Sequence, residues 1–116
     1  MRLKSAIWVA AYVRRCNGAG SFAAVRRRGA DEAGAIYIKI NRLDGTATLY
    51  GPAPQSSFDD SRPSDRAFIA MLGSPQPVPE GEVDAKLARE IKFDSDLWVV
   101  EIESRDGSSF IEEIVT

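Results

Sequence analysis

The most regular alternation of apolar and polar residues in the chain runs from residue 35 to residue 51. It consists of two arms, Ile-Tyr-Ile-Lys-Ile beginning at Ile36 and Thr-Ala-Thr-Leu-Tyr beginning at Thr46, separated by Asp44-Gly45. An Asp-Gly pair between two alternating arms is a strong signal for a β-hairpin. A two-residue turn at this pair places Lys39 opposite Tyr50. One apolar face then combines residues of both arms, which are Ile36, Ile38, Ile40, Ala47 and Leu49.

Two other segments have the composition and spacing of helices. Residues 3–16 contain no Pro or Gly, and the Asn17-Gly18 pair that follows suits a helix C-cap. Residues 80–93 follow Pro79 and carry acids in the first turn. The apolar residues of this second segment, Val83, Leu87 and Ile91, are spaced by four. We predict that this narrow stripe lies on the sheet and that the charged side faces solvent.

The first predicted helix is apolar over most of its circumference. Trp8 and Tyr12 lie one turn apart on one flank. A different face, on which small alanines allow a close approach to the sheet, groups Leu3, Ala6, Ile7, Ala10 and Val13. Two large aromatic residues away from the packed face indicate a deep groove or a partner chain. We therefore predict homodimerisation through the Trp8–Tyr12 flank or through an open sheet edge.

The remaining strands complete an α+β fold. Residues 21–28 are predicted to form a meander with the hairpin, and residues 66–72 and 97–103 are further strands. Residues 109–115 fit either a last strand, which is slightly favoured, or a short helix. We predict one α+β domain over residues 1–116, built on an antiparallel sheet of five or six strands. Its order is α-β-β-β-β-α-β with an optional final β, two helices pack on the sheet, and an exposed loop covers about residues 53–65.

Composition places the chain among ordinary globular proteins. It has 116 residues, 44% of them apolar and 28% charged, which suits one domain with one core. The single cysteine, Cys16, cannot form a disulfide within the chain, so the cytoplasm is the expected location. The apolar run near the N-terminus is short and is closed by Arg14-Arg15, unlike a secretory signal. We expect no membrane span, because no apolar stretch approaches the required length.

Charge is distributed unevenly along the chain. Residues 1–42 hold nine Lys or Arg and two acids, about +7, and the remainder holds six against fifteen, about −9. The candidate anion-binding residues are Arg14, Arg15, Arg26 and Arg28. Neighbouring strand residues point to opposite faces, and the pI is acidic at about 5.2. These two facts favour a simpler interpretation, in which the arginines keep an edge strand soluble and pair with acids of the C-terminal half.

The sequence offers little catalytic chemistry. It contains no histidine, so the commonest general base and metal ligand are missing. Cys16 has no imidazole partner, and the acidic pairs such as Asp94 with Asp96 and Glu101 with Glu103 do not have the spacing of a calcium loop. The glycines at 18 and 20 follow a helix and lack the lysine of a phosphate-binding loop. We predict no catalytic residue, no metal site and no cofactor, and we favour a protein that is not an enzyme.

Four segments resemble one known protein family. They are Ala-Ile-Trp-Val-Ala-Ala-Tyr-Val-Arg-Arg at 6–15, the Ile-Tyr-Ile-Lys-Ile hairpin with Leu-Tyr-Gly-Pro-Ala-Pro at 49–54, Glu-Val-Asp-Ala-Lys-Leu-Ala-Arg-Glu at 82–90, and Phe-Asp-Ser-Asp-Leu-Trp-Val-Val-Glu-Ile-Glu at 93–103. Together they resemble the small alphaproteobacterial proteins of the domain of unknown function 1491. The resemblance implies a short stand-alone bacterial cytosolic protein, and it brings no activity, cofactor or catalytic residue.

These observations favour a non-catalytic binding or interaction module that self-associates or binds an unidentified protein partner. The excess apolar surface of the first helix and the opposite charges of the two halves motivate this prediction. The alternative is a nucleic-acid or anionic-ligand binder that uses the basic N-terminal half. An enzyme based on Asp94, Asp96, Glu101 or Glu103 comes third.

Overall fold

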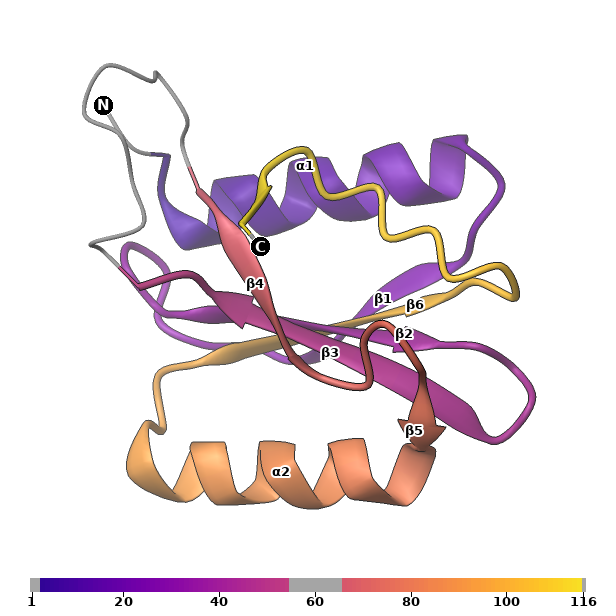
Figure 1. Cartoon of the computed structure of the whole chain (residues 1–116). Helices are drawn as coiled ribbons and strands as arrows, with labels where there is room; N and C mark the ends of the chain where they lie inside the picture. The colour runs from indigo at the N-terminus through magenta and orange to yellow at the C-terminus, as the bar shows by residue number, and fades with distance from the viewer. Residues whose placement is uncertain (1–2, 55–65, 116) are drawn as a thin grey trace.

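The protein is a three-layer structure in which a β-sheet lies between two helices. The computed structural model describes residues 3–54 and 66–115. Helix α1 (Ser5–Gly18) covers one face of the sheet, and helix α2 (Glu80–Phe93) covers the other (Figure 1). The prediction that both helices pack on the sheet is confirmed. Neither of these helices is long and apolar enough to cross a membrane.

Within the described residues, the sheet contains seven strands and is mixed. Its strands are β1 (Ala23–Arg27), β2 (Ile36–Asn41), β3 (Thr46–Pro52), β4 (Phe68–Leu72), β5 (Val78–Pro79), β6 (Trp98–Glu103) and β7 (Ile114–Val115). Their order is β1-β6-β2-β3-β4-β7, and β5 pairs with β3 beside this path. Strand β6 is parallel to β2, and β7 is parallel to β4. The α+β class is confirmed, but the prediction of a purely antiparallel sheet of five or six strands is wrong.

The predicted three-strand meander is also wrong, because β6 lies between β1 and β2. Trp98, Val99 and Val100 are all at most 5% exposed, so β6 is apolar on both faces and suits the interior of a sheet. Strand β1 keeps half-exposed positions, with Val25 at 43%, and takes the edge. The short connection between residues 21–28 and the hairpin favours a meander. A strand that is buried on both faces must nevertheless lie inside the sheet, and this places β6 between β1 and β2.

The hairpin of β2 and β3 is confirmed, with a register one residue away from the predicted one. Its loop has three residues, because the N–H of Arg42 donates to the carbonyl of Thr46 at 3.0 Å. Leu43 and Gly45 adopt left-handed backbone conformations, with φ of 64° and 89°. Lys39 therefore lies opposite Leu49 instead of Tyr50.

A shift of one residue turns the outgoing arm over. Ile36, Ile38 and Ile40 belong to the core beneath α1, whereas Ala47 and Leu49 belong to the core above α2. The predicted single apolar face is therefore wrong. The hairpin contributes to two cores, one on each side of the sheet.

Helix α1 uses a different face from the predicted one. Its buried residues are Ser5, Val9, Tyr12 and Cys16. Tyr12 is fully buried, its ring stacks on Trp8 with centroids 5.1 Å apart, and its hydroxyl donates to the carbonyl of Ser109. Only part of the face predicted to pack on the sheet does so: Ala6 and Val13 contact the core, whereas Leu3 and Ile7 are 47% and 52% exposed. The apolar residues surround most of this helix, so their spacing does not determine which face packs on the sheet. The observed orientation buries the large side chain of Tyr12.

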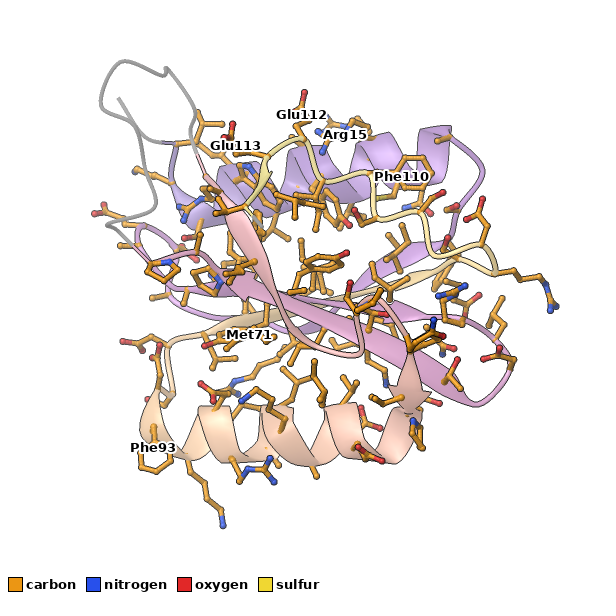
Figure 2. All side chains as sticks on the ribbon, viewed as in Figure 1. Arg15, Met71, Phe93, Phe110, Glu112 and Glu113 are labelled. Atoms are coloured by element: carbon orange, nitrogen blue, oxygen red, sulfur yellow. The ribbon has the colours of Figure 1, made fainter. Side chains whose placement is uncertain are left out.

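The C-terminal segment does not return to β6 as a hairpin. After β6 it runs along α1 and ends as β7 beside β4 (Figure 1). The guanidinium of Arg15 donates to the carbonyl of Phe110 at 2.7 Å and lies 3.7 Å from Glu112 (Figure 2). This path avoids the like-charge pair of Glu101 and Glu112 that a hairpin would create. Most of the predicted loop at 53–65 lies outside the described residues, and Ala53 at its start is buried.

A close approach of two backbones joins the loop after β1 to the turn before β6. An alanine Cβ at Gly29 would lie 2.7 Å from the carbonyl oxygen of Leu97 and closer still to that of Asp96. We predict that Gly29→Ala lowers the free energy of unfolding by about 2 kcal/mol, because these backbone atoms cannot move aside easily. The matched control is Gly18→Ala, whose Cβ meets nothing within 4 Å and which should stabilise α1 by about 0.5 kcal/mol. Urea unfolding of both variants measures the difference, and equal effects would contradict the prediction.

Candidate functional site

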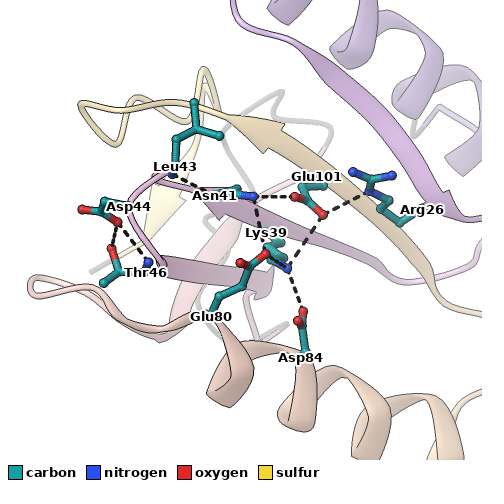
Figure 3. Close-up of polar contacts among 9 residues, drawn as sticks. All are labelled: Arg26, Lys39, Asn41, Leu43, Asp44, Thr46, Glu80, Asp84 and Glu101. Atoms are coloured by element: carbon teal, nitrogen blue, oxygen red, sulfur yellow. Dashed lines mark hydrogen bonds and ion pairs between the residues drawn. The ribbon is translucent and has the colours of Figure 1, made fainter.

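A network of charged side chains lies between the sheet and the N-terminal half of α2. Its centre is Lys39 of β2, whose side chain is 6% exposed. The ammonium nitrogen lies 2.6 Å from Glu80 Oε2, 2.7 Å from Asp84 Oδ1 and 3.8 Å from Glu101 Oε1 (Figure 3). Glu80 and Asp84 are one turn apart on α2, so both reach the same strand position.

The same network continues to the edge of the sheet. Glu101 of β6 accepts a hydrogen bond from Arg26 Nε at 3.1 Å and another from Asn41 Nδ2 at 2.9 Å. Asn41 also donates to Glu80 Oε2 at 3.4 Å (Figure 3). We call these residues the Lys39 network: Arg26, Lys39, Asn41, Glu80, Asp84 and Glu101. It joins β1, β6, β2 and α2 through two cations, three carboxylates and one amide.

The electrostatics of the network keep Lys39 charged. Burial alone would lower the pKa of its ammonium group, but the hydrogen bonds to Asp84 and Glu80 and the charge of Glu101 outweigh burial and raise the pKa. An ammonium group held in this way has no lone pair for nucleophilic or general-base chemistry at neutral pH. The arrangement therefore attaches α2 to the sheet.

The other candidate chemical groups do not assemble with the network. Cys16 is fully buried, and burial raises the pKa of its thiol, which disfavours a reactive thiolate. Asp94 and Asp96 are exposed in the turn after α2, whereas Glu101 is buried against Arg26. Within residues 3–54 and 66–115, no three His, Cys, Asp or Glu side chains are grouped so that they could hold a metal ion.

The four candidate arginines occupy separate places. Arg15 contacts the C-terminal segment, and Arg26 joins the Lys39 network on the opposite face of the sheet. Arg28 lies 3.1 Å from Asp31 and over the ring of Trp98, at 5.0 Å from its centroid. Arg14 is exposed and forms no ion pair with the described residues. The structure thus brings no two of the four to one cavity, and anion binding by this set stays a prediction.

The Trp8–Tyr12 flank is occupied within the chain. Tyr12 is inside the core, and Trp8 packs between Tyr12 and Phe68, with ring centroids 5.1 and 5.2 Å away. The aromatic surface that motivated the dimer prediction at this flank is therefore largely covered. Self-association itself stays a prediction.

An exposed apolar surface lies instead on the other side of α1, which the sequence pattern did not reveal as a surface. Ala10 and Asn17 are seven residues apart in α1, so they share one side of the helix, and Leu3 precedes its first residue, Ser5. Asn17 touches the edge strand β1, which places this side along that edge. We define the α1–β1 rim as Leu3, Ile7, Ala10 and Val25. Its three large side chains are 47%, 52% and 43% exposed.

The edge strand is partly closed by one side chain. The Asn17 amide donates to the carbonyl of Ala23 at 3.2 Å and accepts from the N–H of Ala23 at 3.1 Å. These are the two bonds that a neighbouring strand would make. On the inner side, the N–H of Glu103 donates to the carbonyl of Phe22 at 2.8 Å, and the register continues through Ala24 with Glu101. Alternation then turns the N–H of Val25 outward, and a β-bulge between Val25 and Arg27 ends the regular register of the strand.

The fold defines a class of small α+β proteins with one helix on each face of a mixed sheet. The chain belongs to the DUF1491 family, described as a protein of unknown function, whose model matches residues 3–112. The resemblance found in the sequence is therefore confirmed. No curated protein matches the chain.

Solved structures of relatives have the same architecture. A crystal structure of a DUF1491 family protein from Caulobacter crescentus CB15 is 36% identical, has a TM-score of 0.79 and is matched over 100% of both chains. An NMR structure from the same organism is also 36% identical with a TM-score of 0.79, over 100% of this chain and 99% of that one. The solution structure of protein Atu0922 from A. tumefaciens is 50% identical, with a TM-score of 0.74 over 90% of this chain and 87% of that one.

Removing the central cation of the network should destabilise the fold. We predict that Lys39→Met lowers the free energy of unfolding by about 2 to 3 kcal/mol, because Glu80 and Asp84 lose their cation and the buried Glu101 keeps only Arg26. The loss stays below that of a fully buried pair, since the side chains of Glu80 and Asp84 are 35% and 56% exposed. Lys86→Met is the control, because it removes only a partly exposed pair with Glu90 and should cost less than about 1 kcal/mol. Equal losses in urea unfolding would contradict this.

The same variant gives a prediction about pH. The folded-state pKa of Lys39 is raised above its ordinary value of 10.5, so its stabilising contribution is complete below that value. The contribution is lost as pH rises through the raised pKa. We predict that the stability difference between the wild type and Lys39→Met is constant near neutral pH and narrows above about pH 10.5. Burial raises the pKa of Tyr37 to about 12, but this residue is present in both proteins and cancels in the difference. A stability difference between the two proteins that widens at alkaline pH would contradict this prediction.

Proposed function

We propose that this protein is a non-catalytic interaction module that binds a protein partner at the α1–β1 rim. The observation that carries the proposal is the rim itself, where Leu3, Ile7 and Val25 are each about half exposed beside an open sheet edge. Apolar side chains gathered on a surface and bordered by charge are typical of protein interaction sites. The small residue Ala10, which is exposed on the outer side of α1, allows a partner to approach the helix closely.

The charged groups of the protein support binding more than catalysis. Lys39 is held as an ammonium ion by three carboxylates, and its partners are engaged with it. The nucleic-acid alternative has less support, because Arg15, Arg26 and Arg28 each contact an acidic residue of the chain and lie on different parts of it. The buried single thiol of Cys16 suits a reducing compartment, and we propose the cytoplasm as its location.

A charge placed in the rim should abolish partner capture. We predict that immobilised wild-type protein retains a specific protein from a lysate of a bacterium with a family member, such as A. tumefaciens, and that Ile7→Glu does not. The matched control is Phe93→Glu, which places the same charge on an apolar residue that is 90% exposed at the end of α2, on the other face (Figure 2). Both substitutions lie at exposed positions, and thermal unfolding checks that both variants remain folded. Equal capture by Ile7→Glu and the wild type would overturn the proposed site.

A further inference from the structure

An open groove of about 490 Å³ lies at the end of β6, where this strand leaves the sheet. We infer that this groove binds a lysine side chain of a protein partner, at a site that is separate from the α1–β1 rim. Phe22 before β1, Leu43 in the turn between β2 and β3, and Glu103 at the end of β6 line it. We call it the β6-end groove. The inference goes beyond the proposed function and does not depend on it.

Phe22 and Glu103 are neighbours on one face of the sheet. The N–H of Glu103 donates to the carbonyl of Phe22 at 2.8 Å, which continues the antiparallel register of β1 with β6. Residues that lie opposite each other in this way direct their side chains to the same face. It is the α2 face, because Glu101, two residues before Glu103, contacts Lys39 there. An aromatic residue that is 55% exposed therefore lies beside a carboxylate.

The Glu103 carboxylate is available to a ligand. Glu103 is partly buried, and within residues 3–54 and 66–115 its carboxylate accepts no hydrogen bond and forms no ion pair. Asp106 also lines the groove, but its Oδ1 already accepts from the Ser104 hydroxyl at 2.9 Å and from the N–H of Ser108 at 3.0 Å. A partly buried charge is screened less by salt and water than an exposed one, so Glu103 attracts a cation from outside the chain.

Leu43 adds an apolar wall in a backbone conformation that leucine rarely adopts. Its φ is 64°, and the residue is 40% exposed. Glycine or asparagine adopts this conformation more easily. Leu43 is also a member of neither hydrophobic core of the described residues. A leucine that favours neither the turn nor the core points to a role in binding, since strained positions often belong to functional sites.

A lysine side chain combines the features that these three residues recognise. Phe22 and Leu43 lie on either side of β6, two strand spacings or about 10 Å apart. An aliphatic stem fits between two apolar walls at this spacing, and its methylenes cover them. The ammonium group is attracted both to the Glu103 carboxylate and to the ring of Phe22. A metal ion would gain nothing from the apolar walls.

Cations near the groove favour a ligand with only one positive charge. Arg105 lines the groove and is exposed, and Arg42 Nε donates to the Arg105 carbonyl at 3.2 Å. These guanidinium groups would repel the second ammonium group of a free diamine. A lysine within a partner protein has one ammonium group, and its backbone stays outside the groove. This comparison selects a protein side chain as the occupant.

The inference is tested with Nα-acetyl-lysine methylamide and Nα-acetyl-norleucine methylamide. The norleucine compound keeps the aliphatic stem and lacks the ammonium group. Each is titrated into isotope-labelled protein, and the NMR signals of Phe22, Leu43 and Glu103 are followed. We expect the lysine compound to shift these signals with a Kd of about a millimolar and to bind more weakly as salt is added. We expect the norleucine compound to bind about fivefold more weakly.

Variants of the charged residues give effects of opposite sign. We expect Glu103→Gln to weaken binding of the lysine compound about fivefold, because the attracting carboxylate is lost. We expect Arg105→Gln to strengthen it about twofold, because a repelling charge is removed. The matched control is Glu82→Gln, which removes the same charge from an exposed position of α2 and should leave binding unchanged.

Leu43→Asn separates a role in binding from a role in folding. Asparagine tolerates the left-handed conformation, so we expect the urea midpoint of unfolding to stay the same or rise. Binding of the lysine compound should weaken, because one apolar wall is lost. A lower urea midpoint with unchanged binding would show that Leu43 serves the fold, and it would overturn its place in the site.

The remaining outcomes each decide one part of the inference. Equal binding of the lysine and norleucine compounds, or unchanged binding by Glu103→Gln, overturns recognition of a cation. Tighter binding of 1,5-diaminopentane than of the lysine compound overturns the protein side chain as occupant. Shifts of Phe22 that appear on concentrating the protein alone mean that a second copy fills the groove, which overturns a separate partner. Lysate capture with Ile7→Glu decides the proposed function independently of all these results.

Discussion

The pairing of β2 with β6 is the constraint on which the rest of the structure depends. Six residue pairs from Ile36 with Trp98 to Asn41 with Glu103 join the two strands in parallel. Both strands are buried on both faces, so each face needs its own cover, and α1 and α2 supply one each. The same pairing moves β1 away from β2 to the edge of the sheet. The three-layer arrangement and the open edge beside α1 both follow from it.

Local features of the fold could be predicted from the sequence, and long-range pairing could not. Helix α2 has the predicted bounds because Pro79, the acids of its first turn and the Val83–Leu87 spacing are local signals. The hairpin is likewise marked by Asp44-Gly45. Its register depends on Leu43 adopting a φ of 64°, which a leucine rarely does and no pattern announces. The insertion of β6 between β1 and β2 depends on contacts across some sixty residues, and a single sequence carries no local signal for it.

The same contrast between local signals and long-range contacts applies to the candidate surfaces. The sequence shows an excess of apolar residues on the first helix, but their spacing predicts that Trp8 and Tyr12 form the exposed side. The structure buries Tyr12 and leaves Ile7 exposed, because a helix with apolar residues all round can pack in more than one orientation. The Lys39 network could not be predicted, since the lysine looked like an ordinary polar position of an alternating strand. Its burial follows from the presence of a helix on that face too.

The position of β6 in the sheet also bears on how the chain folds as the ribosome makes it. The first helix and β1 emerge early, yet the strand that holds β1 in place begins only at Trp98, and the segment that lies along α1 comes later still. Helix α1 can pack on Ile36, Ile38 and Ile40 earlier, but β1 has no neighbouring strand until β6 has been synthesised. Contacts between such distant parts of a sequence also slow folding. During that interval the hairpin and α2 are the parts whose partners are already present.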